Sequence, residues 1–351
     1  MRRLLFLLST LIAASQGAFA FELAQGVIVD GARSRIYVMN PEGGIDAVAF
    51  SNGAMLATTA RGAKPLLLYD GALLAQAEGK EGVLSLISLR TQDLEPAFTV
   101  DVPLPSGVQA PVSDRLGLSF HASARMDRNM ILVQWRSMQR TISAVPTREP
   151  GHVRTGFARI DPRDGRLIAS GASEPSTSGT AQEEILGGTA KIFAAVPRCE
   201  SGSLVAAIQY DGDQVTLRRW NTAGEPLPDT RLFGGELTFQ NFSRDCRHLL
   251  ASKKADGWHW HIFSVASGER VAEISSSLPG AEFFLWEDRL IYEASAVEKL
   301  ISGQLTMIQP HRLQAIDFTG KELWARPIRE PAYRGPYPGR GQGDKIKSEG
   351  L

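Results

Sequence analysis

One hairpin pattern recurs along most of the chain. Residues 313–324 read as two short strands on either side of the turn Thr319-Gly320-Lys321. Glycine is favoured in such a turn because a tight hairpin places one residue at positive φ. The same pattern returns with turn glycines at four earlier positions, namely Gly53, Gly165, Gly224 and Gly268. A hairpin repeated at intervals of some tens of residues indicates a closed array of repeats, and short strands joined by tight turns favour a β-propeller.

The repeats group into units of four antiparallel strands, each of which would be one propeller blade. The first unit has strands over residues 26–30, 35–39, 45–50 and 55–59. Six units fit between residues 21 and 330, so we predict an all-β propeller of about six blades. Seven blades are the alternative if the long third unit contains a further blade. In the fourth unit, the first and last strands are expected over residues 191–196 and 226–232.

Three segments depart from the repeat. Residues 137–153 form a proline-containing insertion in the third unit, and residues 297–310 form a second insertion in the sixth. Residues 331–351 are polar and rich in proline and glycine, so we expect a disordered tail. Inserted loops of a propeller are suited to recognition because connecting segments lie on the surface and commonly bind partners.

The N-terminus has the pattern of a signal peptide. Arg2 and Arg3 form a basic start, an apolar run follows over residues 4–14, and Ala18-Phe19-Ala20 is a cleavage site of the small-x-small type. We expect residues 1–20 to be removed after Ala20, so that the mature protein is periplasmic or secreted. No later stretch is long and apolar enough to be predicted as a membrane span.

The charge balance excludes two classes of partner. Lys and Arg together number 38, as do Asp and Glu. Removal of residues 1–20 takes away Arg2 and Arg3 and leaves 36 basic against 38 acidic residues, a net charge of −2. Such a chain lacks the broad positive field that holds nucleic acid or anionic lipid. Neither is therefore expected as a partner.

The hairpin pattern resembles a known repeat. Propellers of the PQQ-like (quinoprotein-like) family have Ala-x-Asp-x-x-Thr-Gly-x-x-x-Trp in each blade. Residues 315–324 contain all of these residue types, with one residue fewer before the threonine: Ala315, Asp317, Thr319, Gly320 and Trp324. Residues 47–57 align without a gap and have Ala49, Asn52 and Ala57 in the places of the Asp, Thr and Trp.

The resemblance implies a propeller in which the tryptophan docks one blade on its neighbour. That role is expected here for Trp324. Catalytic members of the family hold their quinone beneath a disulfide between adjacent cysteines and bind calcium through clustered acidic and amide side chains. The present sequence has neither adjacent cysteines nor such a cluster. It therefore resembles the non-catalytic type, and no cofactor is expected.

The chain contains two cysteines, Cys199 and Cys246. Both fall in the connection between the first and second strands of consecutive units, so both belong to the same face of neighbouring blades. A disulfide needs Cα atoms within about 7 Å, and export would permit one. The sequence leaves open whether the pair is bridged or remains as two free thiols. A redox-active pair is not favoured, because Cys-x-x-Cys spacing is absent.

His259 and His261 flank Trp260 on a predicted strand. Alternation places both imidazoles on one side of the sheet and the indole on the other. Two histidines at this spacing can bind a metal, but a third ligand is needed and the sequence designates none. The alternative is an ordinary blade strand with Trp260 between sheets. No acid–base pair or nucleophile motif is evident, so an enzyme is not favoured, although the question stays open.

We therefore expect an exported, monomeric propeller that binds a protein of the cell envelope or acts as a scaffold there. The insertions at residues 137–153 and 297–310 are the expected recognition loops. Two alternatives remain. One is the propeller subunit of a periplasmic redox enzyme, similar to that of amine dehydrogenases. The other is a propeller with a small-ligand or enzymatic site in its channel.

Overall fold

The structure is a computed structural model. It describes residues 26–113, 118–139, 152–173, 198–201, 204–211, 214–234, 237–243, 245–255, 257–276, 283–294, 296–301, 304–329 and 346–347. All regular secondary structure in these segments is β-strand, which confirms the predicted all-β class. A helix long and apolar enough to cross a membrane is not found among these residues.

The first three blades of the propeller are regular antiparallel meanders. Their strands are, for blade 1, β1 (Val27–Asp30), β2 (Arg35–Met39), β3 (Ile45–Ala49) and β4 (Met55–Thr59); for blade 2, β5 (Lys64–Tyr69), β6 (Ala72–Gln76), β7 (Val83–Arg90) and β8 (Pro96–Pro103); and for blade 3, β9 (Leu118–Asp127), β10 (Met130–Gln139), β11 (His152–Ile160) and β12 (Leu167–Ser173). In each sheet the strands are hydrogen-bonded in chain order, as expected when tight hairpins join them.

The next three blades have the same topology. Their strands are, for blade 4, β13 (Arg198–Ser201), β14 (Leu204–Asp211), β15 (Gln214–Asn221) and β16 (Thr230–Gly234); for blade 5, β17 (Leu237–Phe242), β18 (His248–Ala255), β19 (Gly257–Ser264) and β20 (Arg270–Ser276); and for blade 6, β21 (Phe283–Trp286), β22 (Arg289–Ala294), β25 (Arg312–Asp317) and β26 (Glu322–Pro327).

Blade 4 differs from the sequence expectation at both ends. Its first strand is β13, which follows the predicted residues 191–196; those residues lie outside the described part of the chain. Its last strand was expected over residues 226–232 but begins only at Thr230. The reason is that Pro226 and Pro228 have no N–H group to donate to a sheet, so only a single bridge between Trp220 and Pro226 forms before β16.

The insertion at residues 297–310 is a hairpin, which we call the arm. It consists of β23 (Val297–Ile301) and β24 (Gln304–Gln309), and it interrupts blade 6 between β22 and β25. Within the expected disordered tail, β27 (Ile346–Lys347) pairs with β24; the other residues of the tail lie outside the described part. The insertion predicted at residues 137–153 is shorter in the structure, because β10 continues to Gln139 and β11 begins at His152. The residues between these two strands lie outside the described part of the chain.

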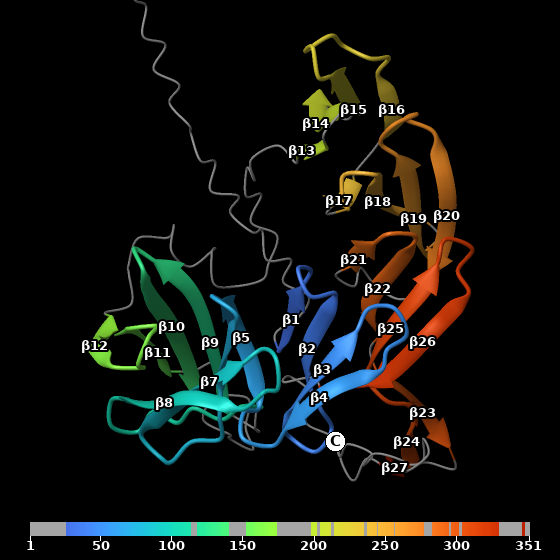
Figure 1. The fold of residues 1–351 in the computed structure, drawn as a ribbon. Coiled ribbons are helices and arrows are strands. Elements are labelled where there is room, and N and C mark those ends of the chain that lie inside the picture. The colour runs from blue at the N-terminus through green and yellow to red at the C-terminus, as the bar shows by residue number, and fades with distance from the viewer. Residues whose placement is uncertain are drawn as a thin grey trace, which may run out of the picture.

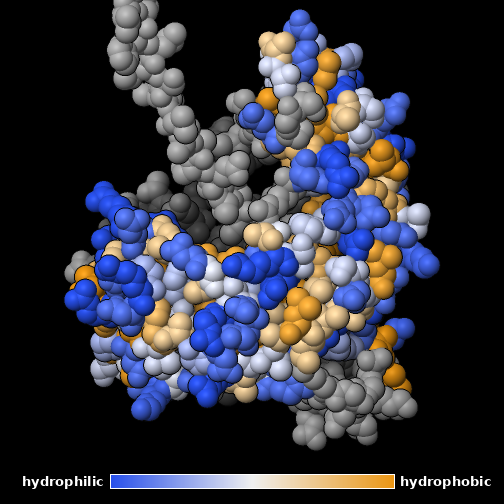
Figure 2. Space-filling view, in the orientation of Figure 1, coloured by the Kyte–Doolittle hydropathy of each residue, from blue (hydrophilic) through white to orange (hydrophobic). Residues whose placement is uncertain are grey.

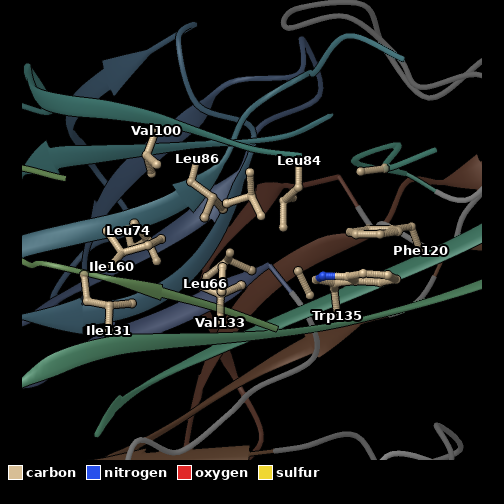
Figure 3. Close-up of a cluster of buried hydrophobic side chains, with 14 of the residues drawn as sticks. Leu66, Leu74, Leu84, Leu86, Val100, Phe120, Ile131, Val133, Trp135 and Ile160 are labelled. Atoms are coloured by element: carbon tan, nitrogen blue, oxygen red, sulfur yellow. The ribbon is translucent and has the colours of Figure 1, made fainter. Parts of the chain in front are cut away.

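The six four-stranded sheets lie side by side along an arc, in the order blade 3, blade 2, blade 1, blade 6, blade 5 and blade 4 (Figure 1). Buried apolar clusters join neighbouring sheets. The cluster between blades 2 and 3 is shown in Figure 3, where the ring of Phe120 lies over that of Trp135 with centroids 6.1 Å apart. The four sheets in the middle of the arc, blades 2, 1, 6 and 5, bury apolar side chains on both faces. This burial supplies the main driving force for the arrangement.

Candidate functional site

The turn between the third and fourth strands of a blade lies against the preceding blade. At Gly53 in blade 1, φ is +68°, and a Cβ atom would lie 2.7 Å from the ring of Trp324 in blade 6. At Gly165 in blade 3, φ is +76°, and a Cβ atom would clash with the ring of Phe98 in blade 2. Both positions therefore require glycine for its conformation and for its lack of a side chain.

The sizes of the facing residues are matched from blade to blade. The residue that packs on the turn of the next blade, which we call the docking residue, stands four positions after the turn residue of its own blade. Trp324, for example, follows Gly320 in this way. Blade 1 has the small Ala57 at this position, and the next blade has Leu94 in place of a turn glycine, at φ +60°; Ala57 packs against the cluster that contains Leu94. The family resemblance pointed to Trp324 alone, whereas Phe98 has the same role and was missed because it is not a tryptophan.

The other turn glycines are less tightly covered. A Cβ atom at Gly268 would clash with Thr230 and would lie 2.7 Å from a guanidinium nitrogen of Arg219, both in blade 4. A Cβ atom at Gly320 would lie 3.8 Å from Ile274 of blade 5. Within the described residues, nothing lies within 4 Å of a Cβ atom placed at Gly224. Gly224 belongs to blade 4, at one end of the arc.

Cys199 and Cys246 form a disulfide, with Cα atoms 5.6 Å apart. Cys199 lies on β13 of blade 4, and Cys246 lies in the turn between β17 and β18 of blade 5. Cys246 is buried and packs in the apolar cluster shared by these blades. The bond is therefore a covalent link between consecutive blades.

His259 and His261 lie on β19 with ring centroids 6.5 Å apart, and Trp260 is buried on the other side of the sheet. Glu273 on β20 is the nearest carboxylate, 3.6 Å from Nδ1 of His259 and 3.9 Å from Nδ1 of His261. Arg270 pairs with Glu273 at 2.7 Å and lies 3.2 Å from Nδ1 of His261. The guanidinium group of Arg270 thus already lies beside the two histidines and Glu273. No group of three metal-ligating side chains is found in the described segments.

A polar network joins the first and last blades of the chain. The buried carboxylate of Asp46 accepts hydrogen bonds from Asn40 at 3.1 Å and Thr58 at 2.8 Å, and it pairs with Arg326 of blade 6 at 3.2 Å. The indole Nε1 of Trp324 donates to the carbonyl oxygen of Phe50 at 3.0 Å. The sequence offered no signal for this network because its partners are far apart along the chain.

A second network joins blades 1 and 2. The hydroxyl group of Tyr37 donates to the carbonyl oxygen of Thr91 at 3.3 Å and lies 3.4 Å from a carboxylate oxygen of Asp30. Arg35 donates to the same carbonyl oxygen at 2.9 Å. Burial, followed by the negative charge of Asp30, raises the pKa of Tyr37 to about 12.

This environment predicts an alkaline titration that is specific to Tyr37. An ordinary tyrosine ionises near pH 10, so the raised pKa stabilises the fold below that pH, and the contribution is lost as pH rises from about 10 to about 12. The absorbance at 295 nm of the wild type minus that of Tyr37→Phe should rise with a midpoint above about pH 11. A midpoint near the ordinary value would show that the phenol is not buried against Asp30.

The arm begins at a buried acid–base pair. Glu293 on β22 and His311, just before β25, are 3.1 Å apart between Oε2 and Nε2. The arm follows the second strand of blade 6, and β10 and β11 are the second and third strands of blade 3, so the arm lies on the same face of the propeller as the end of β10 and the start of β11. Figure 2 shows separate hydrophobic patches on a mainly hydrophilic surface, and Ile301 of the arm is one of the exposed large apolar side chains, at 49%.

Comparisons with known proteins found distant similarity to solved structures only. No family model matches the chain, and no curated protein sequence matches it. Among solved structures, BamB from Moraxella catarrhalis is 11% identical, with 86% of this chain and 75% of that chain covered and a TM-score of 0.29. A eukaryotic initiation factor is 10% identical, with 89% and 90% covered and a TM-score of 0.37. The propeller assignment rests on the sheet topology and blade packing described above.

Proposed function

We propose that this protein is an exported β-propeller that binds another protein and acts as a scaffold in the cell envelope. Its repeats would be of the non-catalytic, PQQ-like type. The observation that carries the proposal is the arm, a hairpin inserted into a regular blade. The arm is not needed to complete blade 6. The strands before and after it, β22 and β25, pair directly with each other over six residues of each strand.

The arm has features of a protein-binding element. In the described residues, β23 pairs on one side with β24 only, so its other edge presents backbone N–H and C=O groups. Such an edge can accept a strand from a partner. Ile301 at the end of β23 adds an exposed apolar contact. An exposed edge next to an exposed apolar side chain is the combination that strand addition uses.

Two observations support export. Residues 1–20 have the three regions of a signal peptide, and Cys199 and Cys246 are bridged. Disulfides persist in oxidising compartments such as the periplasm and are rare in the cytosol. The mature chain would then begin at Phe21.

Affinity purification of the tagged full-length protein from crosslinked envelopes, followed by mass spectrometry, tests the proposal. We expect a reproducible protein partner and a purified chain that begins at Phe21. Replacement of residues 297–309 by a Gly-Ser linker should abolish capture of that partner, and Ile301→Lys should weaken it. Leu56→Lys changes a side chain of similar exposure on β4 and serves as the matched control. Identical partners for the wild type and the linker variant would contradict the role of the arm.

A further inference from the structure

The arm has a third strand that comes from the C-terminal part of the chain. β24 pairs with β23 on one side and with β27 on the other, so this small sheet has the order β23-β24-β27 (Figure 1). The second pairing is antiparallel, with Thr306 opposite Lys347 and Met307 opposite Ile346. β27 has only two residues, whereas β23 and β24 are consecutive strands of one hairpin. Few backbone hydrogen bonds therefore hold β27, and it is the strand of this sheet that is released most readily.

The register gives β27 a defined place on the sheet. Residues directly opposite each other share one face, and residues two apart along a strand return to that face. One face therefore contains the positions of Glu298, Leu300, Leu305, Met307 and Ile346. Four of these five residues are apolar, and apolar residues that face each other stabilise paired strands. β27 thus extends the apolar face of the arm.

The segment that leads to β27 leaves the propeller at the base of the arm. After β26, the N–H group of Ile328 donates to the carbonyl oxygen of His311 at 3.0 Å. His311 lies just beyond the arm, where its imidazole pairs with Glu293. The N–H group of Arg329 then donates to the carbonyl oxygen of Met39 at 2.9 Å. The chain is therefore fixed beside the arm immediately before the segment that ends in β27.

The length of this segment allows β27 to leave β24 and to rejoin it. Ile346 follows Arg329 by 17 positions, and an extended chain of that length spans about 55–60 Å. β24 has six residues and is about 20 Å long. Because the segment starts beside the arm, a released β27 stays near β24 at an effective concentration on the order of 1 mM. It therefore competes with any free peptide for the edge of β24.

Release of β27 gives β24 a free edge of its own. The N–H and C=O groups of such an edge bind an added strand, and the register shows which residues that strand needs. Opposite Met307 it needs an apolar residue, because this position belongs to the apolar face. Opposite Thr306 it tolerates a charged residue, since Lys347 has that place in this chain. The arm thus specifies both the direction and the pattern of the strand.

We propose that the β24 edge of the arm binds an extended segment of a partner protein, and that β27 occupies this edge until the partner displaces it. The partner segment runs antiparallel to β24 and has an apolar residue in the place of Ile346. This inference rests on the proposed protein-binding function and deepens it, because it assigns a second edge of the arm and the kind of segment that binds there.

The test measures competition between β27 and a free copy of the same sequence. The probe is a fluorescein-labelled peptide of residues 342–351, and fluorescence anisotropy follows its binding to the full mature chain. In Ile346→Asp the tethered strand loses its apolar residue, so the probe should bind at least about tenfold more tightly than to the wild type. Ile346→Val keeps an apolar residue and should bind the probe as weakly as the wild type does. The variant with a linker in place of residues 297–309 should not bind the probe.

A cross-link tests whether β27 pairs with the arm of its own chain. Thr306 and Lys347 are directly opposite, so Thr306→Cys, Lys347→Cys should form a disulfide within one chain, detected by mass spectrometry without reduction. In the control Lys299→Cys, Lys347→Cys the two positions lie on either side of β24. Their separation of about 9–10 Å is too long for a disulfide, so no cross-link is expected.

Three outcomes would overturn the proposal. One is equal binding of the probe to the wild type and to Ile346→Asp, including no binding to either. Another is equal cross-linking of the two cysteine pairs. The third is a cross-link between two chains, which would assign the β24 edge to the tail of a second copy. Capture of the envelope partner is measured separately, with the linker variant and Ile301→Lys, so failure of this inference and failure of the protein-binding function are distinguishable.

Discussion

Replacement of Trp324 with alanine will lower the free energy of unfolding by about 3–5 kcal/mol. Trp324 is 8% exposed, packs on Gly53 of blade 1 and donates its indole N–H group to the carbonyl oxygen of Phe50. The substitution leaves a cavity at the contact between the first and last blades and removes a hydrogen bond from a buried carbonyl. Urea unfolding followed by circular dichroism measures the change.

Leu323→Ala is the matched control for this variant. Leu323 is the preceding residue on β26 but is 43% exposed, so its truncation should change stability by no more than about 0.5 kcal/mol. An equal loss for the two variants would show that the indole does not hold the blades together.

A double-mutant cycle separates the two reasons for glycine at position 53. In the wild type, Gly53→Ala should destabilise through its positive φ and through a clash with the indole. In the Trp324→Ala background only the conformational cost remains, so the two effects should differ by about 0.5–3 kcal/mol. Additive effects would contradict the close approach of Trp324 to this turn.

Local signals account for most of the predictable fold. The turns of blades 1 and 2 contain glycine at φ +68° and +76°, at Gly53 and Gly71, so the hairpins could be placed from sequence. Blade 4 was predicted less well because its first predicted strand and its proline-containing segment lack such signals. The arm could be recognised as an insertion, but its two strands were missed. They pair locally, with Ile301 opposite Gln304, and the Ser-Gly pair at residues 302–303 was a turn signal that could have indicated the hairpin.

The contacts between blades were not predictable in the same way. Alternation along β19 places His259 and His261 on one side, as the sequence indicated, but their association with Arg270 and Glu273 arises from pairing with β20. The network around Asp46 depends on Arg326, which is 280 positions away. Such partners leave no local pattern. Only the matched sizes at positions such as Leu94 and Ala57 could have indicated which residues meet.

Loss of the disulfide will destabilise the protein by about 4 kcal/mol. Cys199 and Cys246 are 47 positions apart, and a cross-link that closes a loop of this length restricts the unfolded chain by about that amount at room temperature. The bond also fixes blade 4, which lies at an end of the arc and has a described apolar contact on one side only. Without the disulfide, blade 4 should therefore unfold locally before the rest of the protein.

The double variant Cys199→Ala, Cys246→Ala measures this effect in urea unfolding without leaving a reactive thiol. Alanine at position 246 keeps a Cβ atom at φ +57°, so the backbone cost at this position is the same as in the wild type. Dithiothreitol should lower the stability of the wild type to that of the variant and leave the variant unchanged. Pulse proteolysis should cut the variant first within residues 198–234. Equal stability of the oxidised and reduced wild type would show that apolar contact with blade 5 alone holds blade 4 in the propeller.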